Sequence, residues 1–224
     1  MDTVNTIVLQ VLRWAHFFFG IAWIGHLYYF NFVQAHAEKA LSGDQKKIVV
    51  PNFRGRAIWW FRWGAMITFI TGLAYILYQE TVATHRFFSG WFVNSANLWI
   101  LFGATLGTIM WFNVWFKIWP RQQIIIASVA GQREKPADFD AVVAAAGKFS
   151  RINTYLSIPM LFGMGGRSHF AIGGTVPTLI AMAVVFVVGF GIAYHIVNGA
   201  AAKVRTEFIP AAPAAPPPAA PPAP

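Results

Sequence analysis

The chain contains no cysteine among its 224 residues. Disulfides, thiolate-held zinc, iron–sulfur clusters and a covalently attached c-type haem all require cysteine, so the sequence excludes each of them. Any metal or haem would have to be held by histidine, of which there are six, with methionine as a weaker ligand.

Charged residues are also scarce. They make up 11% of the chain, whereas 57% of the residues are hydrophobic and include 21 Phe and 10 Trp. Soluble domains carry about 25% charged residues, so this composition indicates an integral membrane protein surrounded by membrane lipids. The formal net charge is +9, but the basic residues gather between apolar runs, as in loops retained in the cytoplasm, and no nucleic-acid partner is expected.

The apolar runs predict the architecture, because a membrane span needs about 20 apolar residues. Four segments qualify: 6–35, 57–79, 97–119 and 172–198. The first lacks a basic leader and a cleavage site, so it is expected to be a retained span. A fifth segment, 152–166, is short and interrupted by Pro159, and could span, re-enter or end inside the bundle. We therefore predict an all-α, polytopic membrane helix bundle with four to five transmembrane helices.

The sequence predicts one helical domain and a tail. The bundle covers residues 1–200, and residues 201–224 form a Pro/Ala-rich tail that cannot build a core. A further helix is expected over 138–148, leading into the fifth segment. Lys and Arg are frequent in 36–55 and after Pro120, which predicts that these loops are cytoplasmic and that the N-terminus is periplasmic in a bacterial inner membrane. Five spans then place the C-terminus inside, and four place it outside.

Polar residues of the first span lie on one helical face. Steps of three and four residues return to the same side of a helix, and they connect Arg13, His16, Gly20, Trp23, Leu27, Asn31 and Gln34. We call these seven residues the first-span stripe. His26 lies about 80° round the helix from His16, so one helix cannot present both imidazoles to a single cofactor.

Three histidines are candidates for binding a cofactor. A b-type haem between helices needs two of them at matching depth on different spans. His16 is expected near mid-membrane and His26 near the cytoplasmic face, where His195 would also lie if the chain has five spans. Depth therefore favours pairing His26 with His195 over pairing His16 with His195. The alternative is that each imidazole makes only an interhelical hydrogen bond.

The third span carries two further signals. Its GATLG run, from Gly103 to Gly107, predicts a close contact between helices. After it, Trp111, Trp115 and Trp119 are expected to be interfacial anchors. Asn113 stands among them and is the residue least suited to face lipid.

Several blocks, in this order, resemble a known family. They are RWAHFFFGIAWIG in the first span, GTIMWFNVWFKIWPRQ in the third, SRINTYLSIPMLFGM followed by Ser168 and His169, and the closing AYHIVN. Together they are similar to the membrane domain of bacterial membrane-bound urate hydroxylases of the PuuD type, over most of residues 7–198. The first-span block is also similar to small membrane proteins of the HemJ and copper-resistance CopD type, which implies haem b at His16.

The family resemblance implies an activity. Members oxidise urate to 5-hydroxyisourate and pass electrons to a cytochrome c domain fused after the membrane region. These 224 residues contain no CxxCH motif, so the resemblance implies a separate cytochrome c as partner, and the predicted spans are fewer than in the family domain. The alternative is a non-catalytic accessory subunit packed in a larger respiratory or photosynthetic membrane complex.

Urate also suggests which residues would bind it. A planar monoanion rich in acceptors suits a guanidinium, amide donors and an aromatic face. Arg13, Asn113, Arg151 and Asn153 occupy the family-like blocks, and Trp23 could stack on the ring. Arg13 and Arg151 are predicted on opposite membrane sides, so they cannot both contact one small ligand, and Arg151 could instead anchor its helix at the interface.

Overall fold

The computed structural model describes residues 2–92, 94–170 and 172–204. Over these residues the chain is helical and contains no strand, which confirms the predicted all-α class. Most of the predicted Pro/Ala tail, from residue 205 onward, lies outside the described residues.

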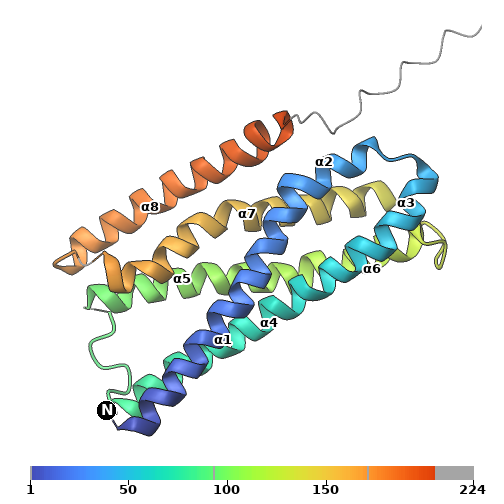
Figure 1. Cartoon of the computed structure of the whole chain (residues 1–224). Helices are drawn as coiled ribbons and strands as arrows, with labels where there is room; N and C mark the ends of the chain where they lie inside the picture. Colours follow the sequence, from blue (N-terminus) through green and yellow to red (C-terminus); the bar gives the residue numbers. More distant parts are fainter. Residues whose placement is uncertain (1, 93, 171, 205–224) are drawn as a thin grey trace, which may run out of the picture.

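Long helices run side by side along the bundle (Figure 1). They are α1 (Thr3–Tyr28), α4 (Gly55–Tyr78), α5 (Ser95–Phe112), α7 (Phe139–His169) and α8 (Thr175–His195). Shorter α-helices are α2 (Ala35–Ala37), α3 (Gly43–Val49) and α6 (Trp119–Val129). The remaining turns are π-helical at η1 (Tyr29–Gln34), η3 (Val50–Arg54), η4 (Gln79–Ala83), η5 (Asn113–Ile118) and η6 (Ile196–Ala200), and 3₁₀ at η2 (Glu38–Ala40) and η7 (Ala201–Lys203).

Four continuous helical runs are long and apolar enough to cross a membrane. They are Thr3–Ala40, Gly43–Ala83, Ser95–Val129 and Thr175–Lys203. The first three contain the predicted segments 6–35, 57–79 and 97–119 and extend beyond them at both ends. The fourth begins at Thr175, three residues after the predicted start of 172–198, and extends beyond its predicted end. The chain is therefore a multi-pass membrane protein.

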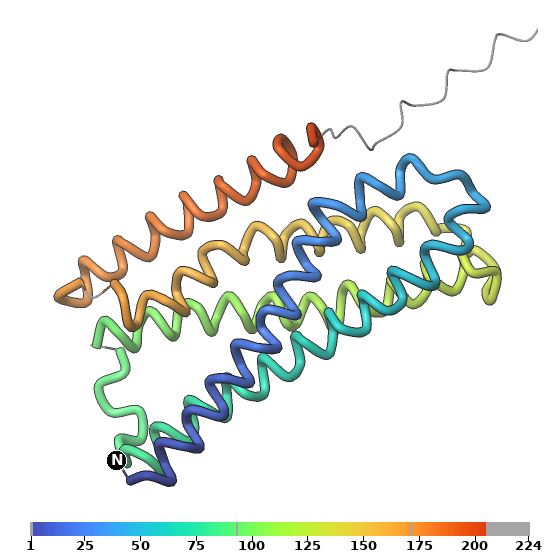
Figure 2. The backbone as a smooth tube through the Cα atoms, viewed as in Figure 1, coloured from blue at the N-terminus to red at the C-terminus, as the bar shows by residue number. Residues whose placement is uncertain are grey.

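Helix α7 resolves the fifth segment. It is a single helix of 31 residues, about 46 Å at 1.5 Å per residue, which exceeds the roughly 30 Å of a bilayer's hydrocarbon core. It starts where a helix was expected, although the Asp138 side chain caps no backbone N–H, and it runs the length of the bundle between α5 and α8 (Figure 2). The segment 152–166 is thus part of one continuous helix that runs along the bundle, but α7 is not among the four runs that are apolar enough to cross a membrane.

The two basic segments meet at one end of the molecule. Turn η3 contacts α6, so the loop around α3 and the loop between α6 and α7 lie together, opposite the N-terminus (Figure 1). We call this the basic-loop end. Helix α8 also finishes there, so the N-terminus and the end of α8 lie at opposite ends of the bundle.

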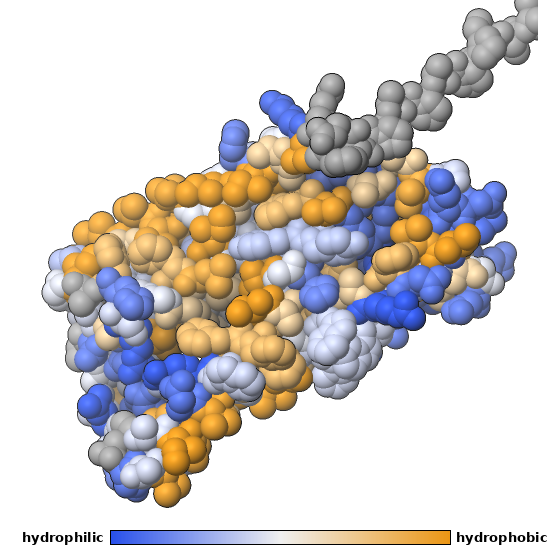
Figure 3. Space-filling view, viewed as in Figure 1, coloured by the Kyte–Doolittle hydropathy of each residue, from blue (hydrophilic) through white to orange (hydrophobic). Residues whose placement is uncertain are grey.

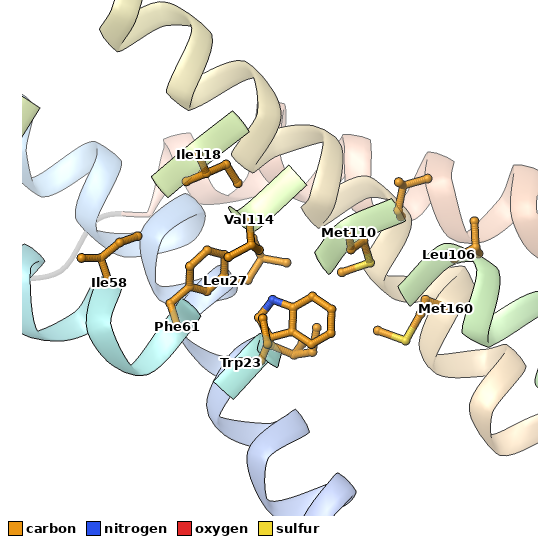
Figure 4. Packing of buried hydrophobic residues seen from close by; sticks show 12 residues of the cluster. Trp23, Leu27, Ile58, Phe61, Leu106, Met110, Val114, Ile118 and Met160 are labelled. Atoms are coloured by element: carbon orange, nitrogen blue, oxygen red, sulfur yellow. The ribbon is translucent and has the colours of Figure 1, made fainter. Parts of the chain in front are cut away.

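The core forms where α1, α4, α5 and α7 converge (Figure 4). Its side chains include Trp23 and Leu27 from α1, Phe61 from α4 and Met110 from α5, each at most 3% exposed. Asn31 and Gln34 on the same side of the first helical run are also buried. The first-span stripe is thus buried in the bundle from Trp23 to Gln34, while outward-facing apolar side chains cover much of α8 (Figure 3).

Small residues set the closest contacts between helices. A Cβ at Gly103 would lie 2.9 Å from the Met164 nitrogen, and a Cβ at Gly163 would lie 2.9 Å from the Gly103 nitrogen. The GATLG run therefore packs directly on α7, as predicted. On the other side of α7, a Cβ at Gly189 of α8 would lie 3.0 Å from Cδ of Pro159, so the mid-helix proline is seated against a residue without a side chain.

Candidate functional site

A line of polar side chains runs along the buried face of α7. Ser150, Asn153, Thr154 and Ser157 follow a spacing of three, four and seven residues and therefore share one face. The last three have an exposed fraction of 0%. With Tyr28, Asn31 and Asn113, which meet them from α1, η1 and η5, they form what we call the polar seam.

The centre of the polar seam is an amide pair. Asn113 Nδ2 donates a hydrogen bond of 2.9 Å to Asn153 Oδ1, and Asn153 Nδ2 donates one of 2.9 Å to the Met110 carbonyl. Asn113 is the first residue of the π-helical turn η5 and is 8% exposed. The prediction that Asn113 does not face lipid is therefore confirmed, and the pair joins α5 to α7 inside the bundle.

A second set of bonds joins α7 to the first helical run. Asn31 Nδ2 donates to Ser150 Oγ and to the Leu27 carbonyl, at 2.8 Å each. Ser157 Oγ donates to the Thr154 carbonyl at 2.7 Å, so the Tyr28 hydroxyl, 2.9 Å away, is the donor to Ser157 Oγ. These bonds fix the rotation of α1 relative to α7.

The polar seam continues toward the basic-loop end through an ion pair. Gln34 donates to Glu38, and the Arg54 guanidinium contacts both carboxylate oxygens of Glu38. The two charged side chains are only 18% and 12% exposed. Glu38 and Arg54 therefore neutralise one another at the point where the seam reaches the surface.

The structure separates the five predicted substrate residues. It brings Asn113 and Asn153 together and places Trp23 in the same core, beside Met110 and Met160 (Figure 4). The indole Nε1 of Trp23 is buried and has no hydrogen-bond partner among the described residues. Arg13 is exposed and donates to the Tyr75 hydroxyl, with its guanidinium 5.2 Å from the centre of that ring.

Arg151 lies far from that position. It is exposed on α7, where Gly147 lies beside its guanidinium. Arg13 belongs to the half of α1 that starts at the N-terminus, whereas Arg151 belongs to the half of α7 at the basic-loop end (Figure 1). The two arginines thus lie toward opposite ends, as predicted, and neither lines the polar seam.

The three candidate histidines occupy separate places. His16 Nδ1 lies 2.9 Å from the Thr68 carbonyl of α4, and its ring fills the space beside Gly72, where a Cβ would be 2.8 Å from Cε1. His26 Nδ1 lies 2.7 Å from the Ala22 carbonyl of its own helix, and its ring lines a surface hollow between α1 and α4. His195 is exposed on the last turn of α8.

A carbonyl oxygen can only accept, so Nδ1 is the donor in both His16 and His26, and Nε2 carries the lone pair when the ring is neutral. The His16 bond is the interhelical contact that was the alternative to ligation. No group of three or more potential metal-ligating His, Asp or Glu side chains occurs among the described residues. Haem binding by these histidines stays a prediction.

The tryptophans of the third span pack on α4 instead of only lining the interface. Trp111 stacks on Phe69 with ring centroids 4.3 Å apart, and Trp115 meets Trp63 edge to face at 5.5 Å. The Arg62 guanidinium lies 3.8 Å from the Trp119 ring centroid. The three tryptophans are four residues apart, and this spacing predicts that they share one helical face.

Sequence reasoning did not select Tyr28, Ser150, Thr154 or Ser157 for the site. The available signal was the spacing of Ser150, Asn153, Thr154 and Ser157 in SRINTYLS, which places these four side chains on one face of α7. Asn113 and Asn153 were selected because an amide in an apolar run is conspicuous, whereas Ser and Thr are common in membrane helices.

One comparison with known proteins identifies the chain's relatives. The model of the family described as "Urate oxidase N-terminal" matches residues 75–216. The match contains Asn113, Asn153 and all of α7, and leaves out α1 and most of α4. No curated protein and no solved structure matches the chain. Since the family model covers well over half of the sequence, the chain belongs to the urate oxidase N-terminal family.

Proposed function

We propose that the protein is a urate-oxidising membrane domain that passes electrons to a separate cytochrome c. The observation that carries this proposal is the family match, with the buried amide pair Asn113–Asn153 inside the matched segment. Purine rings present alternating N–H and C=O groups at one edge. A side-chain amide offers one donor and one acceptor group in a plane, so it complements such an edge.

The reaction needs an electron acceptor outside these 224 residues. The urate monoanion and water give neutral 5-hydroxyisourate, one proton and two electrons. A ferric cytochrome c takes up one electron, so each urate reduces two cytochromes. The chain has no cysteine to attach such a haem, and the cytochrome is therefore assigned to a partner.

Each residue of the centre has a distinct role in this proposal. Asn113 and Asn153 hydrogen-bond the edge of the purine, exchanging their mutual bond for bonds to the ligand. The Asn153–Met110 bond keeps Asn153 oriented while this exchange occurs. Trp23 offers a flat indole and an unpartnered Nε1–H from the same core.

The proposal uses no haem. A b-type haem between helices needs two axial side chains facing one space, but the hollow that His26 lines contains no second histidine, and His16 is packed against Gly72 with Nδ1 bonded to α4. His16 and His26 therefore share no space in which both could hold one haem, and no step is assigned to that group.

Urate binding tests the site before any turnover is measured. We expect urate to raise the thermal midpoint of the purified wild-type protein, because a ligand that binds only the folded state stabilises it. The rise should be absent in Asn113→Ala and retained in Asn198→Ala. Asn198 is exposed in η6, directly after α8, and its amide bonds the Tyr155 hydroxyl. Equal urate-induced shifts of the thermal midpoint in both variants would show that the amide pair does not bind urate.

The membrane orientation is the second expectation. We expect the basic-loop end in the cytoplasm of a bacterial inner membrane and the N-terminus in the periplasm, because short loops rich in Lys and Arg are retained inside. The chain has no cysteine, so a single introduced thiol reports its own side. Ser89 and Gln132 are exposed in loops at opposite ends.

A maleimide that cannot cross the inner membrane, but reaches the periplasm through the pores of the outer membrane, should label Ser89→Cys in intact cells. It should label Gln132→Cys only after the cells are lysed. The reverse pattern would invert the topology. Labelling of both positions from the same side would contradict a membrane crossing by the helical run Ser95–Val129, which separates them.

A specific observation favours a second candidate function. The amides of Asn113 and Asn153 bond to each other and the Tyr28 and Ser157 hydroxyls bond to one another, so the polar seam can also hold helices together without binding anything. The alternative is therefore an accessory subunit of a larger membrane complex. It predicts co-purification with that complex in mild detergent and no thermal shift with urate.

A further inference from the structure

A surface groove between α1 and α4 has the features of a lipid site. It has a volume of about 450 Å³ and is lined by Gly25, His26, Tyr29, Arg56, Ala57 and Trp60, among others. We call it the α1–α4 groove. It lies outside the polar seam, and nothing in the proposed reaction uses it.

The groove faces lipid. Ile21 is 74% exposed, Phe53 64% and Trp60 49%, and all three line it. These side chains belong to helical runs that are apolar enough to cross the membrane. A groove on such a surface is in contact with acyl chains and lipid headgroups, so its natural occupant comes from the bilayer.

The groove is polar at one end and apolar at the other. Arg56 is the second residue of α4 and Tyr29 directly follows α1, so both lie toward the basic-loop end. Ile21 precedes Tyr29 by eight residues, about 12 Å along the helix. A phospholipid has the same order, with a charged headgroup at the interface and an acyl chain pointing to the bilayer centre.

The charge at the polar end is positive and uncompensated. Among the described residues, Arg54 is paired with Glu38 and Lys47 with Asp44, while Arg56 takes part in no ion pair. His26 Nδ1 is engaged by the Ala22 carbonyl, so Nε2 is the ring atom left to accept a hydrogen bond from a headgroup hydroxyl. A guanidinium beside such an acceptor suits a phosphodiester with a hydroxylated headgroup.

The floor of the groove is open. A Cβ added at Gly25 would meet no atom within 4 Å, and the neighbouring wall is made by Ala22 and Ala57. Small side chains here leave room for a chain of methylene groups against the helices. A larger side chain at Gly25 would fill this room without clashing with the protein.

We infer that the α1–α4 groove binds one anionic glycerophospholipid, with the phosphate on Arg56 and an acyl chain over Gly25 toward Ile21. Basic pockets between membrane helices on the cytoplasmic side are established binding sites for anionic headgroups. His26 is then a headgroup contact. In this proposal, His26 lines the α1–α4 groove because it contacts the lipid headgroup, and it does not bind a metal there.

Native mass spectrometry of the full chain in mild detergent tests this inference. Phosphatidylglycerol is titrated against phosphatidylcholine, and an excess of inorganic phosphate is added in a third arm. The wild-type protein should retain one phosphatidylglycerol, bind phosphatidylcholine more weakly, and keep its lipid in the presence of phosphate, because the acyl chain contributes to binding.

Two pairs of variants locate the site. Arg56→Gln should weaken phosphatidylglycerol binding about fivefold, since one basic side chain near a membrane surface contributes about that factor, whereas Arg86→Gln, which removes an exposed cation at the other end, should not. Gly25→Leu should remove the lipid, whereas Gly191→Leu should not, although Gly191 also has open space around it.

Three results would overturn the inference. They are equal binding by Arg56→Gln and Arg86→Gln, displacement of the lipid by inorganic phosphate, and recovery of an uncharged quinone from the groove in place of phospholipid. The variants remain informative because Arg56 and Gly25 are exposed, and unchanged thermal midpoints verify that each protein is folded.

Discussion

Replacing Asn153 by alanine should lower the free energy of unfolding by about 3 kcal/mol, more than any other single change in the polar seam. The side chain is fully buried and bonds both Asn113 and the Met110 carbonyl. Its loss leaves the Asn113 amide without its partner, at a cost of about 1–3 kcal/mol, and opens a small cavity. Asn113→Ala should cost only about 1 kcal/mol, because Asn153 keeps its bond to Met110.

The double variant makes this prediction specific. Once Asn153 is gone, the Asn113 side chain has no bond to lose, so Asn113→Ala combined with Asn153→Ala should be about as stable as Asn153→Ala alone. The coupling free energy should be about 1 kcal/mol, within the range measured for hydrogen bonds between membrane helices. Strictly additive effects in detergent unfolding would show that the two amides do not interact.

Gly163→Ala should be the most damaging addition of a single carbon to the bundle. The new Cβ would lie 2.9 Å from the Gly103 nitrogen and 3.0 Å from its Cα. These are backbone atoms of a neighbouring helix, so α5 and α7 would have to move apart. Overpacking of this kind costs about 1–3 kcal/mol, and a rigid neighbour places the cost near the upper limit.

Gly165 supplies a matched control on the same helix. A Cβ there meets no atom within 4 Å, so Gly165→Ala should be neutral or stabilise α7 by up to about 1 kcal/mol through helix propensity. The two variants have the same composition, and thermal unfolding in one detergent compares them directly. Equal stability of the two would contradict the close α5–α7 contact.

The sequence was sufficient for the framework because lipid imposes simple rules. Spans require about 20 apolar residues, and buried faces repeat every three to four positions. The number and order of the four apolar runs, the burial of Trp23, Leu27 and Asn31, and the contact at Gly103 all follow from these rules. The course of the fifth segment was left open because Pro159 and the glycines of α7 resemble breaks. In the structure, these same residues allow α5 and α8 to pack closely on α7.

The site was harder to predict, since its members do not stand out one at a time. A Thr or Ser can bond a carbonyl of its own helix, as Thr154 does with Ser150, so it is inexpensive anywhere in a span. The shared face of Ser150, Thr154 and Ser157 indicates a site only once α1 and η5 are known to pack against that face. The histidines were also hard to place. Their expected depth in the membrane was the only guide to which of them could pair. The packing of His16 against Gly72 and the bond from His26 to the Ala22 carbonyl depend on side-chain positions that depth does not predict.

The central claim is that this chain oxidises urate and gives the electrons to cytochrome c. Purified protein in liposomes should reduce added ferricytochrome c only when urate is present, with two cytochromes reduced for each urate consumed. Asn113→Ala should abolish most of this rate while remaining folded, and Asn198→Ala should retain it. If wild-type protein that is folded and correctly oriented reduces no cytochrome c with urate, the redox assignment is wrong and the accessory-subunit alternative takes its place.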